Sequence, residues 1–507
     1  MTSKKVLKTA FHSDMLSIDP RKNGDYFSST IQFMVFRGLM HVNEHKEIAP
    51  ALAKSYRLSK DKKTYTFHLR DDIFWSDGTK ITALDFEKSL KKILSPGFPS
   101  LTAQLLYPIK NAEKIAKKEL TADHLDVKAL DEKTLQINLE NPTPYFLFLT
   151  SFCTYFPIPS HIEEENPKWL EDPIKYVKYS GPFKLKKWKR GSEIILVKND
   201  KFYDADKIEI DEVHISIVGN EITALNMYEK NEIDFLSSFL SPLPVDFLGT
   251  VKKRNDYDLF EIGGSSFCVF NIDKYPFNNQ NLRKAFLLSI DRKSITQNIT
   301  QLNEKIATRC VPPLLTSNKE LSFYKDFDIE KAKFHFEKAL KELNIDKKDL
   351  DLTFTYGSYI IHRKEAEALK SMWEKSLGIQ VKLMMFDEAS YLAKLHRHDF
   401  QMALSRFLVH YNDPMNVLER FKYKKHPKNY ANFEDNTFIN MLDTANKTIN
   451  ENERIKILED AERYFIDKAV LAPIYHYNYA IFSKNNVKGI YVGPIGDIYI
   501  ENAKIIK

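Results

Sequence analysis

The stretch from 351 to 404 constrains the fold of this chain most strongly, because strand-like and helix-like segments alternate along it. Apolar, strand-like runs lie at 351–356, 379–386 and 400–409, and a helical pattern at 362–378 separates the first two. A helix that joins two strands of one sheet returns the chain to its starting edge, so the strands run parallel. We therefore predict an α/β fold, with parallel strands in this stretch and mixed β-sheets over the whole chain.

Local patterns predict further elements. Residues 64–69 alternate between apolar and polar and indicate a half-buried strand, and Asp77-Gly78 indicates a tight turn. Thr82 and Asp85 have the spacing of a capping box at the start of a helix. The remaining predicted features are strands at 134–139, 193–198 and 212–218, helices at 281–293, 328–345 and 437–467, and a helix C-cap at Gly378.

Length and composition bound the class of protein. A chain of 507 residues is longer than one hydrophobic core usually supports, so two or more lobes are expected. With 15 glycines and no Gly/Ser-rich linker, the lobes should share several short crossings. Lysine and arginine exceed aspartate and glutamate by 75 − 69 = 6, and the two signs are interspersed. Neither nucleic acid nor an anionic membrane is therefore an expected partner.

The sequence lacks the signatures of catalysis and of metal binding. It contains no GxGxxG, GxxxxGK[ST], GxSxG or HExxH pattern. Cys153, Cys268 and Cys310 lie too far apart in the sequence for a CxxC metal site, although one disulfide bridge with one free thiol remains possible. We therefore predict no enzymatic activity, no cofactor and no metal site.

The stretch 407–421 contains a histidine in an unusual place. An apolar run from Phe407 to Val409 stops at His410. Asn412-Asp413-Pro414 then indicates a tight turn, because proline fixes its own φ and disfavours the helical region for the preceding residue. His410 either ends a core strand or faces a ligand.

Aromatic side chains make up 13% of the chain, and many of them fall where loops or strand ends are expected. Together they suit a cleft that covers an extended, chemically varied ligand. These residues are Tyr26, Phe27, Tyr107, Tyr155, Phe156, Phe267, Phe270, Tyr411 and the run from Tyr475 to Tyr479.

Eight blocks of the sequence, in order, resemble one known family. Segment 48–86 is similar to the signature region of the extracytoplasmic solute-binding proteins of ABC importers, family 5. That family includes oligopeptide- and dipeptide-binding proteins, and the nearest likeness is to the oligopeptide-binding proteins. The other blocks are SIDP (17–20), FRGLM (36–40), 180–205, 230–235, 275–295, 372–383 and HYNDP (410–414).

The resemblance implies a two-lobed periplasmic-binding-protein clamp with an extra inserted domain. In the family, the lobes close around an extended oligopeptide and deliver it to ABC permease subunits in the inner membrane. Carried onto this chain, lobe I comprises 1–40, 176–262 and 469–507, the inserted domain 41–175, and lobe II 263–468. The first residues are basic but lack an apolar core, so a signal peptide was either removed or never present. Because an importer's binding protein must lie outside the inner membrane, the resemblance implies a periplasmic monomer whose signal peptide has been removed.

The resemblance also implies ligand-binding positions. Segment 24–29 matches a stretch whose backbone pairs with the ligand, and Tyr107 matches an aromatic residue of the cleft. His362 matches a histidine that helps to bind the C-terminal carboxylate of a peptide. The full set of expected ligand-binding residues is Gly24, Asp25, Tyr26, Phe27, Ser28, Tyr107, Phe267, His362, Arg406, Phe407, His410, Tyr411, Asn412 and Asp413.

Departures from the family pattern bear on the identity of the ligand. His410 stands where the family has an acidic residue that pairs with the α-ammonium group of a peptide. Leu404 and Glu388 replace a family arginine and a family tryptophan, although Arg406 lies two residues after Leu404. The ligand is therefore either a modified or cell-wall peptide without the usual free amino end, or one whose ammonium pairs with Asp25. A nickel chelate or another small solute is a further alternative.

Overall fold

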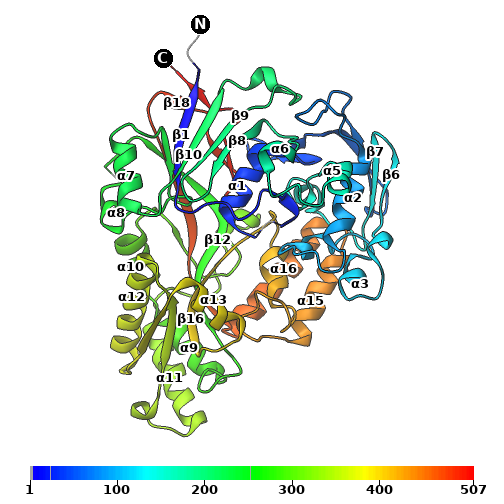
Figure 1. Ribbon diagram of the computed structural model, residues 1–507. Helices are drawn as coiled ribbons and strands as arrows, with labels where there is room; N and C mark the ends of the chain where they lie inside the picture. Colours follow the sequence, from blue (N-terminus) through cyan, green and yellow to red (C-terminus); the bar gives the residue numbers. More distant parts are fainter. Residues whose placement is uncertain (1–3, 23, 252, 507) are drawn as a thin grey trace. The chain divides into compact units, whose positions relative to one another are not determined.

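The computed structural model describes residues 4–22, 24–251 and 253–506, and the chain divides into two compact units (Figure 1). Unit 1 comprises Met1–Pro244, Asn255–Phe260 and Ala480–Lys507, and unit 2 comprises Val245–Arg254 and Glu261–Tyr479. The chain therefore passes from one unit to the other four times, in keeping with the shortage of glycine linkers. The predicted inserted domain, 41–175, lies within unit 1, and its separation from the rest of that unit stays a prediction.

The main sheet of unit 1 is mixed. Its strands, in spatial order, are β8 (Phe183–Lys189), β9 (Glu193–Lys198), β10 (Glu212–Ile217), β1 (Val6–Phe11) and β11 (Phe235–Ser237). β1 pairs in parallel with both β10 and β11, whereas β9 pairs antiparallel with β8 and β10. β9 and β10 confirm the strands predicted at 193–198 and 212–218.

A second, antiparallel sheet of unit 1 confirms the local predictions for 64–94. Its order is β4 (Ala53–Leu58), β5 (Thr64–Leu69), β7 (Thr134–Asn138) and β6 (Val127–Asp131). Gly78 has a φ of 92°, as the predicted turn requires, and helix α2 (Ala83–Ile93) follows. The capping box is present, since the Thr82 amide donates to Asp85 Oδ2 at 2.9 Å.

The other helices and strands of unit 1 are short. The helices are α1 (Tyr26–Val35), α3 (Ala112–Ala116), α4 (Phe146–Leu149), α5 (Ser160–Glu165), α6 (Pro173–Tyr176) and α7 (Glu221–Glu229). The strands are β2 (Met40–Val42), β3 (Ile48–Pro50), β18 (Val487–Lys488), β19 (Tyr491–Val492), β20 (Ile498–Tyr499) and β21 (Lys504–Ile505).

The sheet of unit 2 contains the alternating stretch. In spatial order its strands are β15 (Lys382–Phe386), β14 (Thr353–Gly357), β16 (Met402–Leu408), β12 (Tyr257–Phe270) and β17 (Leu471–Ser483), with β13 (Lys305–Ile306) against β17. β14 pairs in parallel with β15 and with β16, which confirms the predicted parallel strands. β16 pairs antiparallel with β12, so the sheet is mixed, as predicted.

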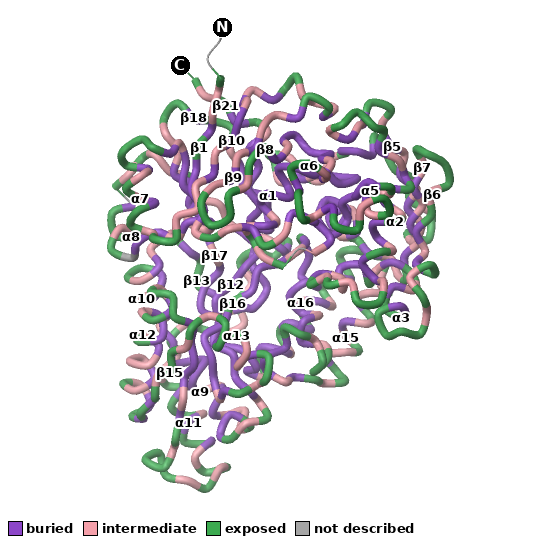
Figure 2. Tube along the Cα trace, viewed as in Figure 1, coloured by how far each residue is buried: buried purple, intermediate pink, exposed green. Residues whose placement is uncertain are grey.

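Two crossover helices cover opposite faces of these parallel strands. α12 (Ile360–Leu377) joins β14 to β15, and α13 (Glu388–His396) joins β15 back to β16 on the other side of β14. Right-handed crossovers in opposite directions place their helices on opposite faces. The Trp373 ring of α12 packs on Phe354 at 5.0 Å, and α12 turns buried residues to the sheet (Figure 2). Gly378 ends α12 with a φ of 68°, which confirms the predicted C-cap.

Two helices expected to be continuous are each broken. The predicted helix 281–293 is α9 (Gln280–Leu288) followed by α10 (Arg292–Ile295), and 437–467 is α15 (Asn436–Lys447) followed by α16 (Glu451–Asp467). Asp291 and Asn450 start the second helix of each pair by accepting an amide of its first turn. The remaining helices are α8 (Val245–Val251), α11 (Ile329–Leu343), as predicted at 328–345, and α14 (Met415–Leu418). Among the described residues, no helix is long and apolar enough to cross a membrane.

Candidate functional site

The three parallel strands of unit 2 end at one edge of their sheet. β14 ends at Gly357, β15 at Phe386 and β16 at Leu408. The helices that follow β14 and β15 begin at Ile360 and Glu388 on opposite faces. Open α/β sheets bind ligands outside the carboxyl ends of strands whose crossovers diverge in this way. This edge is therefore the place where a site is expected.

Arg406 presents a positive charge at this edge. It is exposed although its neighbours Ser405 and Phe407 on β16 are buried. Its guanidinium donates to Nε2 of His362 at 2.9 Å and lies 5.5 Å from the centre of the Tyr359 ring. A guanidinium held in this way can bind a carboxylate through two parallel hydrogen bonds.

His362 accepts the hydrogen bond from Arg406 because it is uncharged. Its side chain is buried, and burial, followed by the positive charge of Arg406, lowers the pKa of His362 to about 3. A neutral imidazole has one nitrogen that accepts a hydrogen bond, and here Nε2 does so. The structure therefore gives His362 a role in positioning Arg406.

Glu388, at the start of α13, is the acidic group of the same edge. Its Oε1 is buried and has no hydrogen-bond partner among the described residues. Burial raises the pKa of the Glu388 carboxyl group, and the charge of Arg406 opposes that rise. The carboxyl group lies against Gly357, where a Cβ atom would stand 2.3 Å from Oε1, so a side chain at position 357 would displace the Glu388 carboxyl group.

His410 lies just beyond the end of β16 and is half-buried. Its amide donates to Oδ1 of Asn416 at 3.3 Å. Burial, together with the positive charges of Arg420 and Lys428, lowers the pKa of His410 to about 3, so the imidazole is neutral at pH 7. The surroundings of His410 are therefore cationic, in contrast to the acidic position expected from the family.

Two residues of the turn after His410 make contacts inside the protein. Both carboxylate oxygens of Asp413 accept hydrogen bonds from Arg454, at 2.7 and 2.9 Å. Tyr411 is 2% exposed, and its hydroxyl donates to Oε1 of Glu419 at 2.7 Å. Asp413 and Tyr411 therefore hold the turn in place, while Asn412 is exposed, and ligand contact by these three residues stays a prediction.

Phe267 and Phe407 face each other on the paired strands β12 and β16. Both rings are buried, with their centres 5.5 Å apart, and the guanidinium of Arg420 lies 5.2 Å from the Phe407 ring. These contacts explain their burial, and ligand contact by either ring stays a prediction.

In unit 1, the predicted backbone-pairing stretch is largely helical, and its pairing with a ligand stays a prediction. Helix α1 begins at Tyr26, and Asp25 is its N-cap. Oδ1 of Asp25 accepts the Ser28 amide at 2.8 Å and Oδ2 accepts the Ser28 hydroxyl at 2.6 Å. Oγ of Ser28 also accepts the Leu16 amide at 2.8 Å, and ligand contact by Ser28 stays a prediction. Asp25 serves as a helix cap, and its pairing with an ammonium group stays a prediction.

The other predicted residues of unit 1 differ in exposure. Tyr26 is 44% exposed and its ring contacts Phe239 edge-on at 4.5 Å, whereas Phe27 is half-buried. Tyr107 is 39% exposed. Gly24 lies so close to Leu101 that a Cβ atom would stand 2.2 Å from Leu101 Cδ1. Ligand contact by Gly24, Tyr26, Phe27 and Tyr107 stays a prediction.

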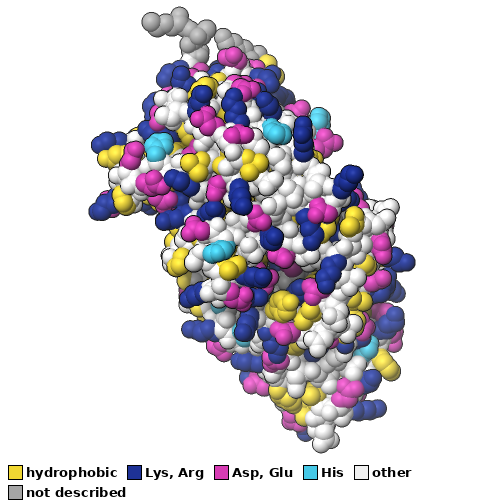
Figure 3. Space-filling view, turned by 90° about the vertical axis from the view of Figure 1, so that its right-hand side faces the viewer, with side chains coloured by type: hydrophobic (Ala, Val, Ile, Leu, Met, Phe, Trp, Pro, Cys, Tyr) yellow, Lys and Arg dark blue, Asp and Glu magenta, His cyan; other side chains and the backbone are white. Residues whose placement is uncertain are grey.

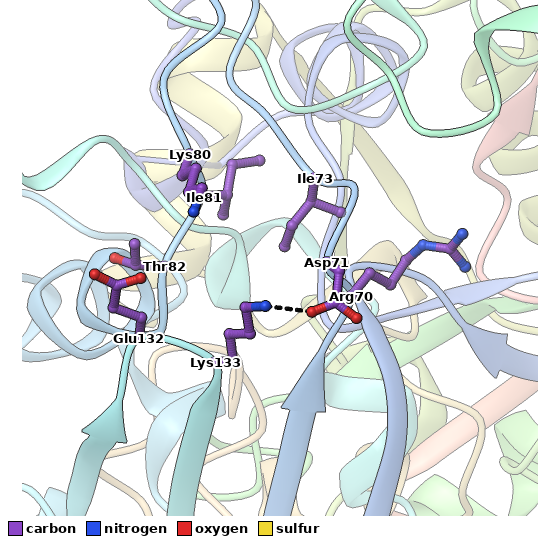
Figure 4. A pocket seen from close by; sticks show the side chains of 8 residues that line it. All are labelled: Arg70, Asp71, Ile73, Lys80, Ile81, Thr82, Glu132 and Lys133. Carbon is purple, nitrogen blue, oxygen red and sulfur yellow. Dashed lines mark hydrogen bonds and ion pairs between the residues drawn. The ribbon is translucent and has the colours of Figure 1, made fainter.

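Two hollows in the described part of the chain are lined by none of the expected ligand-binding residues. One in unit 1, of about 10 Å³, is spanned by an ion pair between Lys133 and Asp71 and has room for about one water (Figure 4). The other, in unit 2, is about 360 Å³, and the cation of Lys394 is paired with Asp399 at 2.7 Å. It is lined by Lys274, Tyr275, Thr353, Thr355, Met384, Phe386, Lys394, Asp399, Phe400 and Gln401. In the described part of the chain, no three His, Cys, Asp or Glu residues are placed so that they could hold a metal ion.

Sequence reasoning missed several members of the unit 2 site. Tyr359, Arg420 and Lys428 belong to no motif, and only the fold brings them beside Arg406 or His410. Glu365 was also missed, although its spacing of three from His362 on a helix was a usable signal. The run from Tyr475 to Tyr479, expected in a loop or at a strand end, lies inside β17.

The chain has two α/β units, and a fixed arginine, a neutral histidine and a tyrosine lie at the carboxyl edge of the unit 2 strands. These are features of proteins that bind small solutes. This chain belongs to the bacterial extracellular solute-binding proteins, family 5, whose middle-region model matches residues 47–429. The oligopeptide-binding protein OppA of Bacillus subtilis is 36% identical to it, over 99% of this chain and 92% of the relative.

Solved structures agree with this assignment. A periplasmic oligopeptide-binding protein of an ABC transporter from Borrelia burgdorferi has 29% sequence identity and a TM-score of 0.87, covering 99% of this chain and 100% of that chain. The murein tripeptide binding protein MppA of Escherichia coli has 27% identity and a TM-score of 0.87, covering 100% and 99%. The fold is therefore that of the oligopeptide-binding proteins, and these relatives are named for what they bind, none for a reaction.

Proposed function

We propose that this chain is the substrate-binding component of a peptide ABC transporter, which captures an extended oligopeptide and delivers it to a membrane permease. The family match and the peptide-binding relatives support the proposal. Closure of two lobes around the peptide, a periplasmic location after removal of a signal peptide, and a monomeric state belong to the same proposal. So does the absence of catalytic activity, because the relatives are binding proteins.

The observation that carries the proposal is the Arg406–His362 pair at the carboxyl edge. A peptide of any sequence ends in an α-carboxylate, so a fixed guanidinium binds that end without selecting side chains. His362 holds the guanidinium by accepting one N–H at 2.9 Å and adds no competing charge. Such recognition suits a protein that must accept varied peptides.

Native mass spectrometry with a random tripeptide library tests this proposal. The purified chain is unfolded, dialysed free of small molecules, refolded and mixed with the library at equimolar concentration. We expect tripeptide adducts in a one-to-one ratio, and the corresponding C-terminal amide library should give far fewer. Absence of adducts from both libraries would contradict the peptide-binding function.

A second candidate is a peptide without a free amino end, such as a modified or cell-wall peptide. The neutral His410 with cationic Arg420 and Lys428 around it supports this candidate, since an ammonium would find no negative partner in His410. A relative that binds murein tripeptide has the same fold. Isothermal titration with a tripeptide and its N-acetyl form separates the candidates. Clearly tighter binding of the free-amine form would reject the amino-blocked ligand.

Nucleic acid is not proposed as a partner. On the face shown in Figure 3, lysine and arginine side chains are interspersed with aspartate and glutamate, without a stripe of one sign. Interspersed charges give no extended positive potential of the kind that attracts a phosphate backbone.

A further inference from the structure

Glu365 is a buried carboxyl group one helical turn after His362 on α12. Its side chain is 1% exposed, and the hydroxyl of Tyr475, on β17, donates to its Oε1 at 2.5 Å. A carboxyl group at this depth stays ionised only where hydrogen bonds and a positive charge offset the loss of water. The peptide-binding proposal assigns Glu365 no contact with the ligand.

The ionisable groups around Glu365 come from several elements. They are His362 on its own helix, Arg406 on β16, Tyr475 and Tyr477 on β17, and Glu304 just before β13. Burial raises the pKa of Glu365 to about 7, Glu304 adds to the rise, and the hydrogen bond from Tyr475 and the charge of Arg406 oppose it. The cation that favours ionised Glu365 is therefore Arg406, since His362 is neutral.

Arg406 serves two anions if a ligand carboxylate binds to it. Arg406 is bonded to His362, which lies one helical turn before Glu365, and its charge favours the ionised form of Glu365, while Arg406 itself is exposed and can meet a ligand. A ligand carboxylate beside Arg406 weakens the attraction between Arg406 and ionised Glu365, and it also repels the Glu365 carboxylate. Both effects favour the protonated form of Glu365.

We propose that Glu365 takes up a proton when a ligand carboxylate binds at Arg406, so that ligand binding by unit 2 is coupled to proton uptake. The inference rests on the proposed function, because it needs a ligand with a carboxylate. The proton comes from solvent and converts the Glu365 carboxylate to a carboxylic acid, and no other bond is made or broken. Glu365 is thus a positioning residue whose charge adjusts to the ligand.

The coupling has a measurable size. If the ligand raises the pKa of Glu365 by about one unit from 7, about 0.4 proton enters at pH 7 and affinity falls about fivefold between pH 6 and pH 8. A C-terminal amide of the same peptide brings no negative charge to Arg406 and should give no uptake.

Isothermal titration of the full chain with tri-alanine, in buffers of different ionisation enthalpy, measures this uptake at pH 7. The apparent binding enthalpy should vary linearly with buffer ionisation enthalpy in the wild type. Glu365→Gln keeps an acceptor for the Tyr475 hydroxyl but cannot titrate, so the slope should vanish while tri-alanine still binds. Glu367→Gln is the matched control, because Glu367 is an exposed residue of the same helix, and it should keep the wild-type slope.

A second variant guards against a folding defect in the first. Tyr475→Phe removes a hydrogen bond that favours the ionised form, so the pH of maximal uptake should rise. Tri-alanine binding with no dependence on buffer in the wild type, or the same slope in Glu365→Gln, would overturn this inference and leave peptide binding intact. Failure of tri-alanine to bind, together with empty library spectra, would instead contradict the proposed function and this inference with it.

Discussion

The buried pair of Asp413 and Arg454 shows how a residue in a ligand-like motif can serve the fold. Both side chains are almost inaccessible, and both oxygens of Asp413 are bonded to the guanidinium. Removing one partner of such a pair leaves an uncompensated buried charge, which costs far more than the net gain of forming the pair.

Asp413→Asn should therefore destabilise the protein by about 3–5 kcal/mol. Urea unfolding followed by circular dichroism measures the change. Asp346→Asn, which breaks an exposed pair with Lys348, serves as the control and should have no measurable effect. A loss below about 1 kcal/mol in Asp413→Asn would contradict a structural role for this residue.

Buried neutral histidines make unit 2 sensitive to acid. His476 is 5% exposed, its Nδ1 shares a hydrogen bond of 2.7 Å with the Ser265 hydroxyl, and burial lowers its pKa to about 3. The unfolded chain binds a proton at this residue below about pH 6.5 and the folded chain does not. Its contribution to stability is therefore complete above pH 6.5 and is lost as the pH falls toward 3.

Replacing His476 with asparagine should reduce this acid sensitivity. Between pH 7 and pH 5, the wild type should lose about 2 kcal/mol through this one group, and His476→Asn should lose that much less. Urea unfolding at the two pH values measures the difference within each protein, so a general effect of the substitution cancels. Equal pH dependence in both proteins would show that His476 is not buried as a neutral group.

At the scale of elements, helix α12 shows how a local signal places a site. Gly378 ends the helix in the left-handed region, at a φ of 68°, and the strand β15 begins four residues later. This cap sets the residue at which α12 ends, and Tyr359 and His362 lie at the opposite end of the same helix. A side chain at Gly378 would strain the left-handed backbone.

Gly378→Ala should accordingly destabilise the protein by about 1 kcal/mol. Gly249→Ala is the matched control, because Gly249 lies inside helix α8, has no positive φ, and a Cβ atom would stand 3.6 Å from Gln301. That control should be neutral or slightly stabilising, since alanine favours helices over glycine. Thermal unfolding of the two variants should therefore shift in different directions, and equal shifts would contradict the cap.

Elements governed by local signals could be predicted from the sequence. The parallel strands of 351–404, the capping box of Thr82 and Asp85, and the C-cap at Gly378 depend on residues close in the chain. The breaks before Asp291 and Asn450 were missed, because helical periodicity continues across them while the capping side chains start a new helix.

The state of the candidate site could not be predicted in the same way. The neutrality of His410 depends on burial and on Arg420 and Lys428, which the fold brings to it. Ser28 accepts a hydrogen bond from Leu16, and Asp413 accepts one from Arg454. No local sequence pattern predicts these partners. Resemblance can identify a position in a family, while tertiary contacts decide which atoms there remain available to a ligand.

At the scale of the whole molecule, the chain joins two α/β units by four crossings rather than by one linker. The arginine, histidine and tyrosine of the candidate site all belong to unit 2. The central claim is therefore that unit 2 supplies the binding site for the carboxylate end of a peptide, and that Arg406 carries its charge.

Isothermal titration with tri-alanine and with its C-terminal amide tests that claim most directly. The wild type should bind the carboxylate form at least about tenfold more tightly, since a hydrogen bond to a charged group contributes about 1.5–3 kcal/mol. Arg406→Gln should abolish the preference, whereas Arg363→Gln, at an exposed position on α12, should retain it. Equal affinity of the wild type for the two forms, or an undiminished preference in Arg406→Gln, would contradict the account.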